Sequence, residues 1–337
     1  MSSSDLTVVV MTRDRIDLLE KALSSVFDRQ SKPPSVIVSD NSTREYSELN
    51  EFQQRYGFSY IRQSGTLTAT DHHNICLQLP ATRWVWLLHD DDELRNGAVR
   101  GIEKFLNQTH DVGIVVGGVE DITYDGAVTR HWVPRVKETP RGDEGLLELG
   151  DEWKARAPCQ IFGKQESLES GGFQDSAGYP SDVAFACKLA HDYGVRFFPD
   201  VIGLSRMGTH QTSYVKTEKQ TQRWVFFHCK QVELIRSLGA DTQVVNRLAD
   251  FLIWKTYANY LSELISVEHK PMFNHGLKKL CMNHAPEAGH WHQRVQNKFP
   301  FLFWGPGWMP GWLVWPLYRL FRKVRSLWGL LNGSTIA

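Results

Sequence analysis

A cluster of acids stands directly after an apolar segment: residues 84–88 are Trp-Val-Trp-Leu-Leu, and after His89 come Asp90, Asp91, Asp92 and Glu93. An uninterrupted apolar run of this kind is typical of a central parallel strand that is covered on both faces. The acids then lie at the carboxyl end of that strand, where open α/β sheets bind ligands. Because neighbouring carboxylates repel each other, a cation between them is stabilising. Mg²⁺ and Mn²⁺ bind carboxylates together with substrate phosphates, so the cluster predicts a metal–diphosphate site.

The alternative for the same acids is a solvated turn ahead of a helix that begins near Asn96. Carboxylates favour the positive end of a helix dipole, so a turn of this kind needs no ligand. The position directly after a buried strand favours the metal site over the turn.

The elements that must position the acids alternate between strand and helix up to about residue 118. Apolar and β-branched runs predict strands at 6–11, 35–39, 58–62, 84–88 and 112–116. Apolar residues at helical spacing separate them, which predicts an α/β fold with a doubly wound, mostly parallel sheet. Right-handed crossovers would bring Thr12–Asp14, Asp40 and Asp90–Asp92 to one edge of that sheet.

Composition narrows the class of protein. The chain has 337 residues, which suits one large domain or a domain with an accessory part. Its formal net charge is zero, so we expect no nucleic-acid partner. The five cysteines are scattered without CxxC spacing, which suits a reducing cytoplasm and argues against structural zinc. We find neither a secretion signal nor an apolar run long enough to span a bilayer.

Beyond residue 118 the pattern is less regular. A hairpin turn is predicted at 124–127, a charged and mobile acceptor loop at 137–156, a helix at 182–191 and a strand at 195–198. From about residue 217 only helical periodicity remains. We therefore predict an α/β domain over 1–215, a helical accessory region over 216–295 and a separate tail over 296–337.

The tail is rich in tryptophan and has a one-sided charge. Trp304, Trp308, Trp312 and Trp315 precede a basic amphipathic segment, and no Asp or Glu follows Glu287. Tryptophan favours the membrane–water interface, and each basic residue gains roughly 1 kcal/mol near an anionic surface. We expect peripheral binding to the cytoplasmic face of the cell membrane. The alternatives are that this segment docks on the protein's own core or forms a contact in a homo-oligomer. Neither explains why no acidic residue occurs in it.

The order of these motifs resembles the GT-A-fold glycosyltransferases of family 2, which are inverting enzymes that use nucleotide-sugar donors. The resemblance is carried by Thr12-Arg13-Asp14-Arg15, Ser39-Asp40-Asn41-Ser42, His89-Asp90-Asp91-Asp92, and Gly171-Gly172-Phe173 ahead of Ser181-Asp182. It covers roughly residues 5–215 and implies a GT-A, Rossmann-like catalytic domain there. Two departures stand out: His89 replaces the usual first acid of the DXD element, and His72-His73 replaces an arginine before Asn74.

The resemblance also implies roles for individual residues. The donor is expected to contact Thr12, Asp14, Asp40, Asn74, Asp90, Asp92 and Arg206. The ligands of a Mn²⁺ or Mg²⁺ ion are expected to be Asp91, Asp92 and His210. Asp182 is expected to be the catalytic base.

Each of these roles has a structural alternative. Asp182 could simply cap a helix N-terminus, Asp40 could form an Asx-turn, and His210 could be an ordinary surface histidine. The chemistry nevertheless agrees with the resemblance, since one base and no covalent step predicts inversion. A positioned carboxylate base contributes ~10²–10⁴-fold to rate.

The most specific hypothesis is an inverting, metal-dependent glycosyltransferase that acts on a lipid-linked or surface saccharide, as in O-antigen or capsule synthesis. A nucleotidyltransferase on a related sheet is a second reading, but residues 12–14 lack the glycine of a phosphate loop. A non-catalytic, membrane-docked protein that binds saccharides or nucleotides is a third, against which the intact aspartates argue.

Overall fold

The computed structural model describes residues 5–134, 139–150, 155–174, 181–208, 233–245 and 248. The chain divides into two compact units, and all of these residues belong to the first, which comprises Met1–Val215 and Lys230–Leu248. The predicted tail, His210 and most of the predicted accessory region lie outside the described residues. Among the described residues, no helix is long and apolar enough to cross a membrane.

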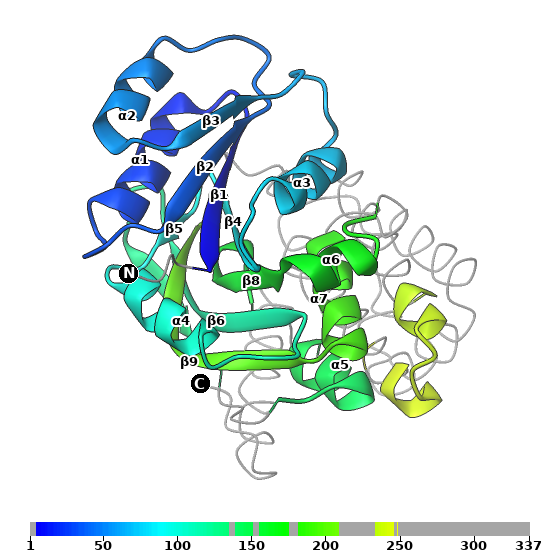
Figure 1. Cartoon of the computed structure of the whole chain (residues 1–337). Coiled ribbons are helices and arrows are strands. Elements are labelled where there is room, and N and C mark those ends of the chain that lie inside the picture. Colours follow the sequence, from blue (N-terminus) through cyan, green and yellow to red (C-terminus); the bar gives the residue numbers. More distant parts are fainter. Residues whose placement is uncertain are drawn as a thin grey trace, which may run out of the picture. The chain divides into compact units, whose positions relative to one another are not determined.

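One sheet organises this unit, with strand order β3-β2-β1-β4-β8-β6-β9-β5, and β7 pairs with β6 (Figure 1). Its first half is parallel and consists of β1 (Leu6–Thr12), β2 (Ser35–Asp40), β3 (Ser59–Arg62) and β4 (Trp84–His89). Its second half is mixed and consists of β5 (Glu93–Leu94), β6 (Ile114–Ile122), β7 (Val128–Trp132), β8 (Gln160–Gly163) and β9 (Val195–Arg206).

The α/β class and the mostly parallel sheet are confirmed, and the sheet is mixed because several of its pairs are antiparallel. The strand β8 lies between β4 and β6 and runs antiparallel to both. The strand that follows β4 in the predicted alternation, β6, is therefore not its neighbour. The alternation of strand-like and helix-like patterns along the sequence predicts the elements, but it does not predict which strands pair with each other.

The helices are α1 (Ile16–Phe27), α2 (Glu48–Tyr56), α3 (Ala69–Gln78), α4 (Ala98–Leu106), α5 (Gly142–Gly150), α6 (Lys164–Glu169) and α7 (Ser181–Asp192), with a 3₁₀ turn at Ala157–Cys159. The charged segment 137–156 is therefore not simply a loop, because α5 occupies much of it. Leu146 and Leu149 of α5 are buried, and α5 packs against α7.

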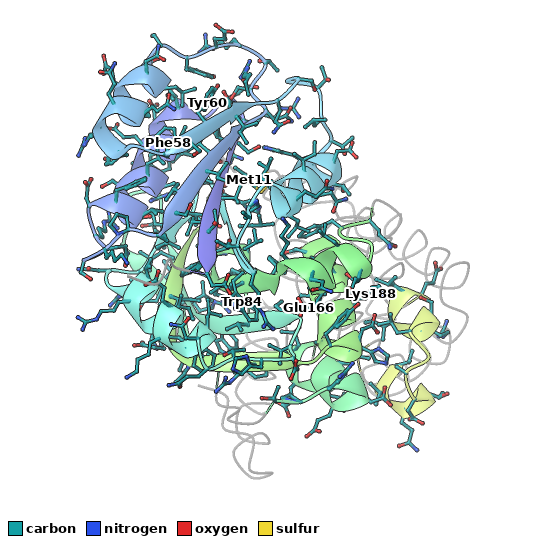
Figure 2. All side chains as sticks on the ribbon, in the orientation of Figure 1. Met11, Phe58, Tyr60, Trp84, Glu166 and Lys188 are labelled. Carbon is teal, nitrogen blue, oxygen red and sulfur yellow. The ribbon has the colours of Figure 1, made fainter. Side chains whose placement is uncertain are left out.

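The core is centred on β1 and β4, the two strands that deliver the acidic cluster. Every residue of β1 is buried, and Trp84 of β4 lies in the interior of the sheet (Figure 2). Trp86 is fully buried, and its indole Nε1 donates a hydrogen bond to the Pro158 carbonyl at 2.9 Å. Burial of both tryptophans fixes the strand whose end carries the candidate site.

A second tie joins α3 to the loop that follows α6. The Asn74 amide donates to the Phe173 carbonyl at 2.9 Å and accepts from the Phe173 N–H at 2.8 Å. Gly172 has φ +69°, and a Cβ there would meet Asn74 Oδ1 at 2.4 Å. The Gly-Gly-Phe motif is thus explained by backbone conformation and by close approach of a side chain.

We predict that Gly172→Ala destabilises the protein more than a glycine substitution that introduces backbone strain alone. The positive φ costs ~1–2 kcal/mol, and loss of both Asn74–Phe173 hydrogen bonds costs about 2 kcal/mol more. Gly57→Ala is the matched control, because Gly57 has φ +73° and nothing within 4 Å of an added Cβ. Urea unfolding of the full chain measures the difference, and equal losses for the two variants would contradict this account.

Candidate active site

The carboxyl ends of β1, β2 and β4 meet at one edge of the sheet, as the sequence predicted. Thr12 and Asp40 are paired in register at the ends of β1 and β2. The Asp90 N–H donates to the Met11 carbonyl at 2.9 Å, which places the acidic turn after β4 beside the end of β1. The polar strand ends therefore form one site.

Asp90 lies beneath this site rather than on its surface. Its carboxylate accepts hydrogen bonds from Thr12 Oγ1 at 2.9 Å and from the Arg13 N–H at 3.1 Å, and pairs with Arg15 Nη2 at 3.1 Å. Burial raises the pKa of Asp90 to about 7, although the Arg15 charge lowers it. The side chain is 1% exposed, and its contacts in this structure are with the 12–15 turn.

His89, Asp91 and Asp92 form a group that could hold a metal ion. One ligand atom from each lies within 4.8 Å of the others. One nitrogen and two carboxylate oxygens suit Mn²⁺ and are compatible with Mg²⁺, so the side chains fit the cation that the sequence predicted. Asp91 and Asp92 are thus where the sequence put them, whereas His89 was not predicted as a ligand.

An arginine and a backbone N–H already stabilise part of the negative charge of Asp91 and Asp92. Arg15 Nη1 lies 2.8 Å from Asp91 Oδ2, and the backbone N–H of Arg206 donates to Asp92 Oδ1 at 3.0 Å. Burial raises the pKa of Asp92, and the Asp91 charge raises it further. A divalent cation here would favour the ionised form of both carboxylates.

Asp40 is buried and its carboxylate is fully used within the protein. It accepts from the Ser42 N–H at 2.8 Å, from the Tyr60 hydroxyl at 2.8 Å, and from Arg62 Nη1 at 2.7 Å. Burial, with the hydrogen bond to Asp40, raises the pKa of Tyr60 to about 12. The structure therefore contains the Asx-turn that was the alternative for Asp40, and the side chain is 0% exposed.

Asp14, in contrast, is exposed at the rim of the site. Its backbone has φ 56°, and its carboxylate accepts from the N–H and the hydroxyl of Thr43 at 2.9 and 3.0 Å. The Asp14 N–H donates to Ser42 Oγ at 2.8 Å. These bonds hold the loops after β1 and β2 together and leave Asp14 accessible to a ligand.

Arg206, which was expected to contact the donor, lies in the interior of the protein. The strand β9 extends to Arg206, and this side chain is 2% exposed. Its guanidinium pairs with Glu93 and donates to the carbonyls of Thr123 and Tyr124 at 3.0 and 2.6 Å. Although the sequence around Arg206 is polar, its ion pair with Glu93 is buried and joins β9 to the segment after β4.

Asp182 lies in the first turn of α7, close enough to His89 for each to influence the other's pKa. Burial raises the pKa of Asp182, and a hydrogen bond from the Val183 N–H opposes this shift. Its Oδ1 atom is buried and accepts no hydrogen bond from the described residues. A carboxylate oxygen of this kind can accept a proton from a substrate.

Two histidines of α3, His72 and His73, lie next to the site. His73 Nε2 is 2.9 Å from His89 Nε2, and His73 Nδ1 is 2.6 Å from the Ala69 carbonyl. His72 Nε2 lies 3.0 Å from Ser39 Oγ. Burial lowers the pKa of His72 to about 4 and that of His73 to about 3, so both rings are neutral at neutral pH. In the sequence, these two residues stood out because they replace the arginine that the family usually has before Asn74.

Comparisons with known proteins agree with this architecture. A family model described as "Glycosyl transferase family 2" matches residues 7–172. An uncharacterized protein of Mycobacterium tuberculosis, MT1568, is 22% identical over 199 residues, and the match spans 56% of this chain and 62% of that protein.

Solved structures show the same fold. S. aureus TarS 1–349 superposes with a TM-score of 0.57 and 14% identity over 83% of this chain and 81% of that chain. Its complex with UDP-GlcNAc gives a TM-score of 0.57 and 15% identity over the same shares. The mannosyltransferase PcManGT from Pyrobaculum calidifontis, in complex with GDP-Man and Mn²⁺, gives 0.51 and 15% over 97% of this chain and 88% of that chain.

We predict that the buried His72 makes the protein less stable as the pH falls from 6.5 towards 4. The unfolded chain binds a proton near the ordinary pKa of 6.5, whereas the folded protein does so only near 4. The free energy of unfolding should therefore fall with acidification, by up to about 1.4 kcal/mol per pH unit from this residue.

The measurement is urea unfolding between pH 7 and pH 4. His72→Asn should give a shallower slope than the natural chain, and substitution of the exposed His110 by Asn should leave the slope unchanged. Parallel curves for the natural chain and His72→Asn would contradict the assignment.

Proposed function

Because residues 7–172 make this chain a member of glycosyl transferase family 2, we propose that it transfers a sugar from a nucleotide-sugar donor to a saccharide acceptor with inversion. The observation that carries the proposal is the proximity of two groups. The three potential metal ligands stand at the end of β4, and the Asp182 carboxylate stands at the start of α7. The UDP-GlcNAc and GDP-Man complexes of the solved neighbours support a nucleotide sugar as donor.

On the donor side, His89, Asp91 and Asp92 would hold Mn²⁺ or Mg²⁺. When bound, the ion supplies Lewis-acid stabilisation of the negative charge on the leaving diphosphate. The exposed turn at Asp14 borders the nucleoside, and Thr12, which is 4% exposed and donates its hydroxyl to Asp90, supports that turn from below. Asp40, Asn74 and Asp90 act one layer below, because each holds a loop of the site in position.

On the acceptor side, Asp182 is the general base. It takes the proton of the attacking hydroxyl as that oxygen bonds to the anomeric carbon, and the bond from this carbon to the diphosphate breaks with its electron pair. One displacement inverts the configuration. Burial raises the pKa of Asp182, which moves it towards the operating pH and improves it as a base.

The acceptor that we propose is lipid-linked or a surface saccharide, and the protein acts at the inner face of the cell membrane. The support is the composition of residues 296–337, where tryptophans and basic residues occur without a single acid. Such a segment lies in the interface of an anionic membrane and would bring the site to its substrate.

Substitutions of Asp182 and of Asp91 should impair different steps, the chemical step and donor binding. Asp182→Asn should keep donor binding and lower turnover by ~10²–10⁴-fold, because only the base is lost. Asp91→Asn should lose the metal-dependent binding of the donor itself. Asp17→Asn, on the exposed face of α1, is the matched control and should behave as the natural chain.

The readouts are thermal shift with Mn²⁺ and UDP-GlcNAc or GDP-Man, and nucleotide release in the presence of membrane lipid extract. Bound donor raises the apparent stability by mass action. Undiminished turnover in Asp182→Asn would remove its role as base. Donor stabilisation that needs neither Mn²⁺ nor Asp91 would remove the metal site.

The tail generates a separate prediction. Removal of residues 296–337 should release the protein from anionic vesicles while Mn²⁺-dependent donor binding persists. Replacement of Arg319, Arg322, Lys323 and Arg325 by glutamine should weaken sedimentation with phosphatidylserine vesicles and reduce its salt dependence. Equal sedimentation of the shortened and full chains would contradict a membrane role for this segment.

A further inference from the structure

We propose that His89 binds the metal ion through Nδ1, and that His73 is the positioning residue that directs this nitrogen towards the ion. The inference rests on the proposed function, because the ion is the one that would hold the donor diphosphate. It adds a nitrogen ligand and a supporting histidine to a site that the sequence predicted to consist of carboxylates and His210.

The hydrogen-bond partners assign the tautomer of each ring. A carbonyl can only accept, so the 2.6 Å contact with the Ala69 oxygen places the proton of His73 on Nδ1. The Nε2 atom of the neutral His73 ring then carries a lone pair. Its contact with His89 Nε2 at 2.9 Å requires that His89 donates, so the His89 proton is on Nε2.

The remaining nitrogen of His89, Nδ1, therefore carries a lone pair. The opposite tautomer of His89 would point two lone pairs at each other across 2.9 Å, which is repulsive. The chain from the Ala69 carbonyl through both rings thus leaves one basic nitrogen of His89, and this residue groups with Asp91 and Asp92. A ligating histidine whose other N–H is held by a second acceptor is the usual arrangement at metal sites.

His73 is well fixed for this task. Its ring meets His89 edge-on, with centroids 5.1 Å apart and an interplanar angle of 89°, and it packs on Phe173 at 4.8 Å. The next residue, Asn74, is bonded at both ends of its amide to the Phe173 backbone. The Gly-Gly-Phe loop therefore holds α3, and α3 holds the imidazole that orients His89.

The chemical consequence is a preference among metals. Imidazole nitrogen suits Zn²⁺ better than the hard ions Mg²⁺ and Ca²⁺, and affinity for a site with nitrogen and oxygen ligands rises from Mn²⁺ to Co²⁺. We expect His89→Asp to keep a cation site while narrowing the advantage of Co²⁺ and Zn²⁺ over Mg²⁺. We expect His73→Phe, which keeps a ring but removes the acceptor, to weaken Mn²⁺ binding about tenfold.

The test is titration of the full chain with Mn²⁺, followed by electron paramagnetic resonance, with pulsed measurement of ¹⁴N coupling to the bound ion. The natural chain should show ¹⁴N coupling, and His89→Asp should bind Mn²⁺ without it. His73→Gln, whose amide oxygen can accept from His89, should recover most of the affinity that His73→Phe loses. His72→Asn, a buried histidine on the same helix bonded to Ser39 instead, should stay within twofold of the natural chain.

The outcomes separate the inference from the proposed function. Mn²⁺ that binds, depends on Asp91 and lacks ¹⁴N coupling would overturn the role of His89 and leave the metal-dependent transferase intact. Coupling that persists undiminished in His89→Asp would do the same, because another nitrogen such as that of His210 would then account for all of it. A natural chain that binds no Mn²⁺ yet transfers sugar would overturn both the inference and the metal site. Circular dichroism of each variant confirms that it is folded.

Discussion

The constraint on which the rest of this structure depends is the crowding of four consecutive acids at the end of one buried strand. Asp90, Asp91, Asp92 and Glu93 are between 1% and 8% exposed, so water does little to reduce their mutual repulsion. The protein therefore brings cations to them from distant elements: Arg15 comes from the start of α1, and Arg206 from the end of β9. The pair with Arg15 holds the turn after β1 against the acidic cluster, and the pair with Arg206 holds the end of β9 there.

The parts of the fold that could be predicted from the sequence are those that local patterns determine. Apolar runs gave the strands around the site, and their order placed Asp40 and the acidic turn on one edge. The position of β8 between β4 and β6 and the full length of β9 were not predicted. Strand pairing joins residues far apart in the sequence, and Arg206 looks like a surface residue because its partner, Glu93, is 113 positions away.

The candidate site was predicted in outline for the same reason. Polar residues at strand ends can face either the ligand or the protein, and only burial separates the two. Asp14 is exposed. Asp40 and Asp90 are buried, and their carboxylates accept hydrogen bonds from neighbouring strands and turns of the protein. The sequence therefore identified this edge of the sheet, but it could not show which of its polar side chains are exposed there and which are buried beneath it.

The histidine at position 89 is consistent with this electrostatic constraint. An aspartate there, as the resemblance would have it, would add a fifth carboxylate to a buried run of four. A neutral imidazole offers a lone pair to a cation without adding negative charge, and so avoids the desolvation cost of another carboxylate. It needs an acceptor for its other N–H, because an unpaired buried donor is itself destabilising. His73 meets that need, so the two departures from the family motif, at 73 and at 89, are explained as one coupled change.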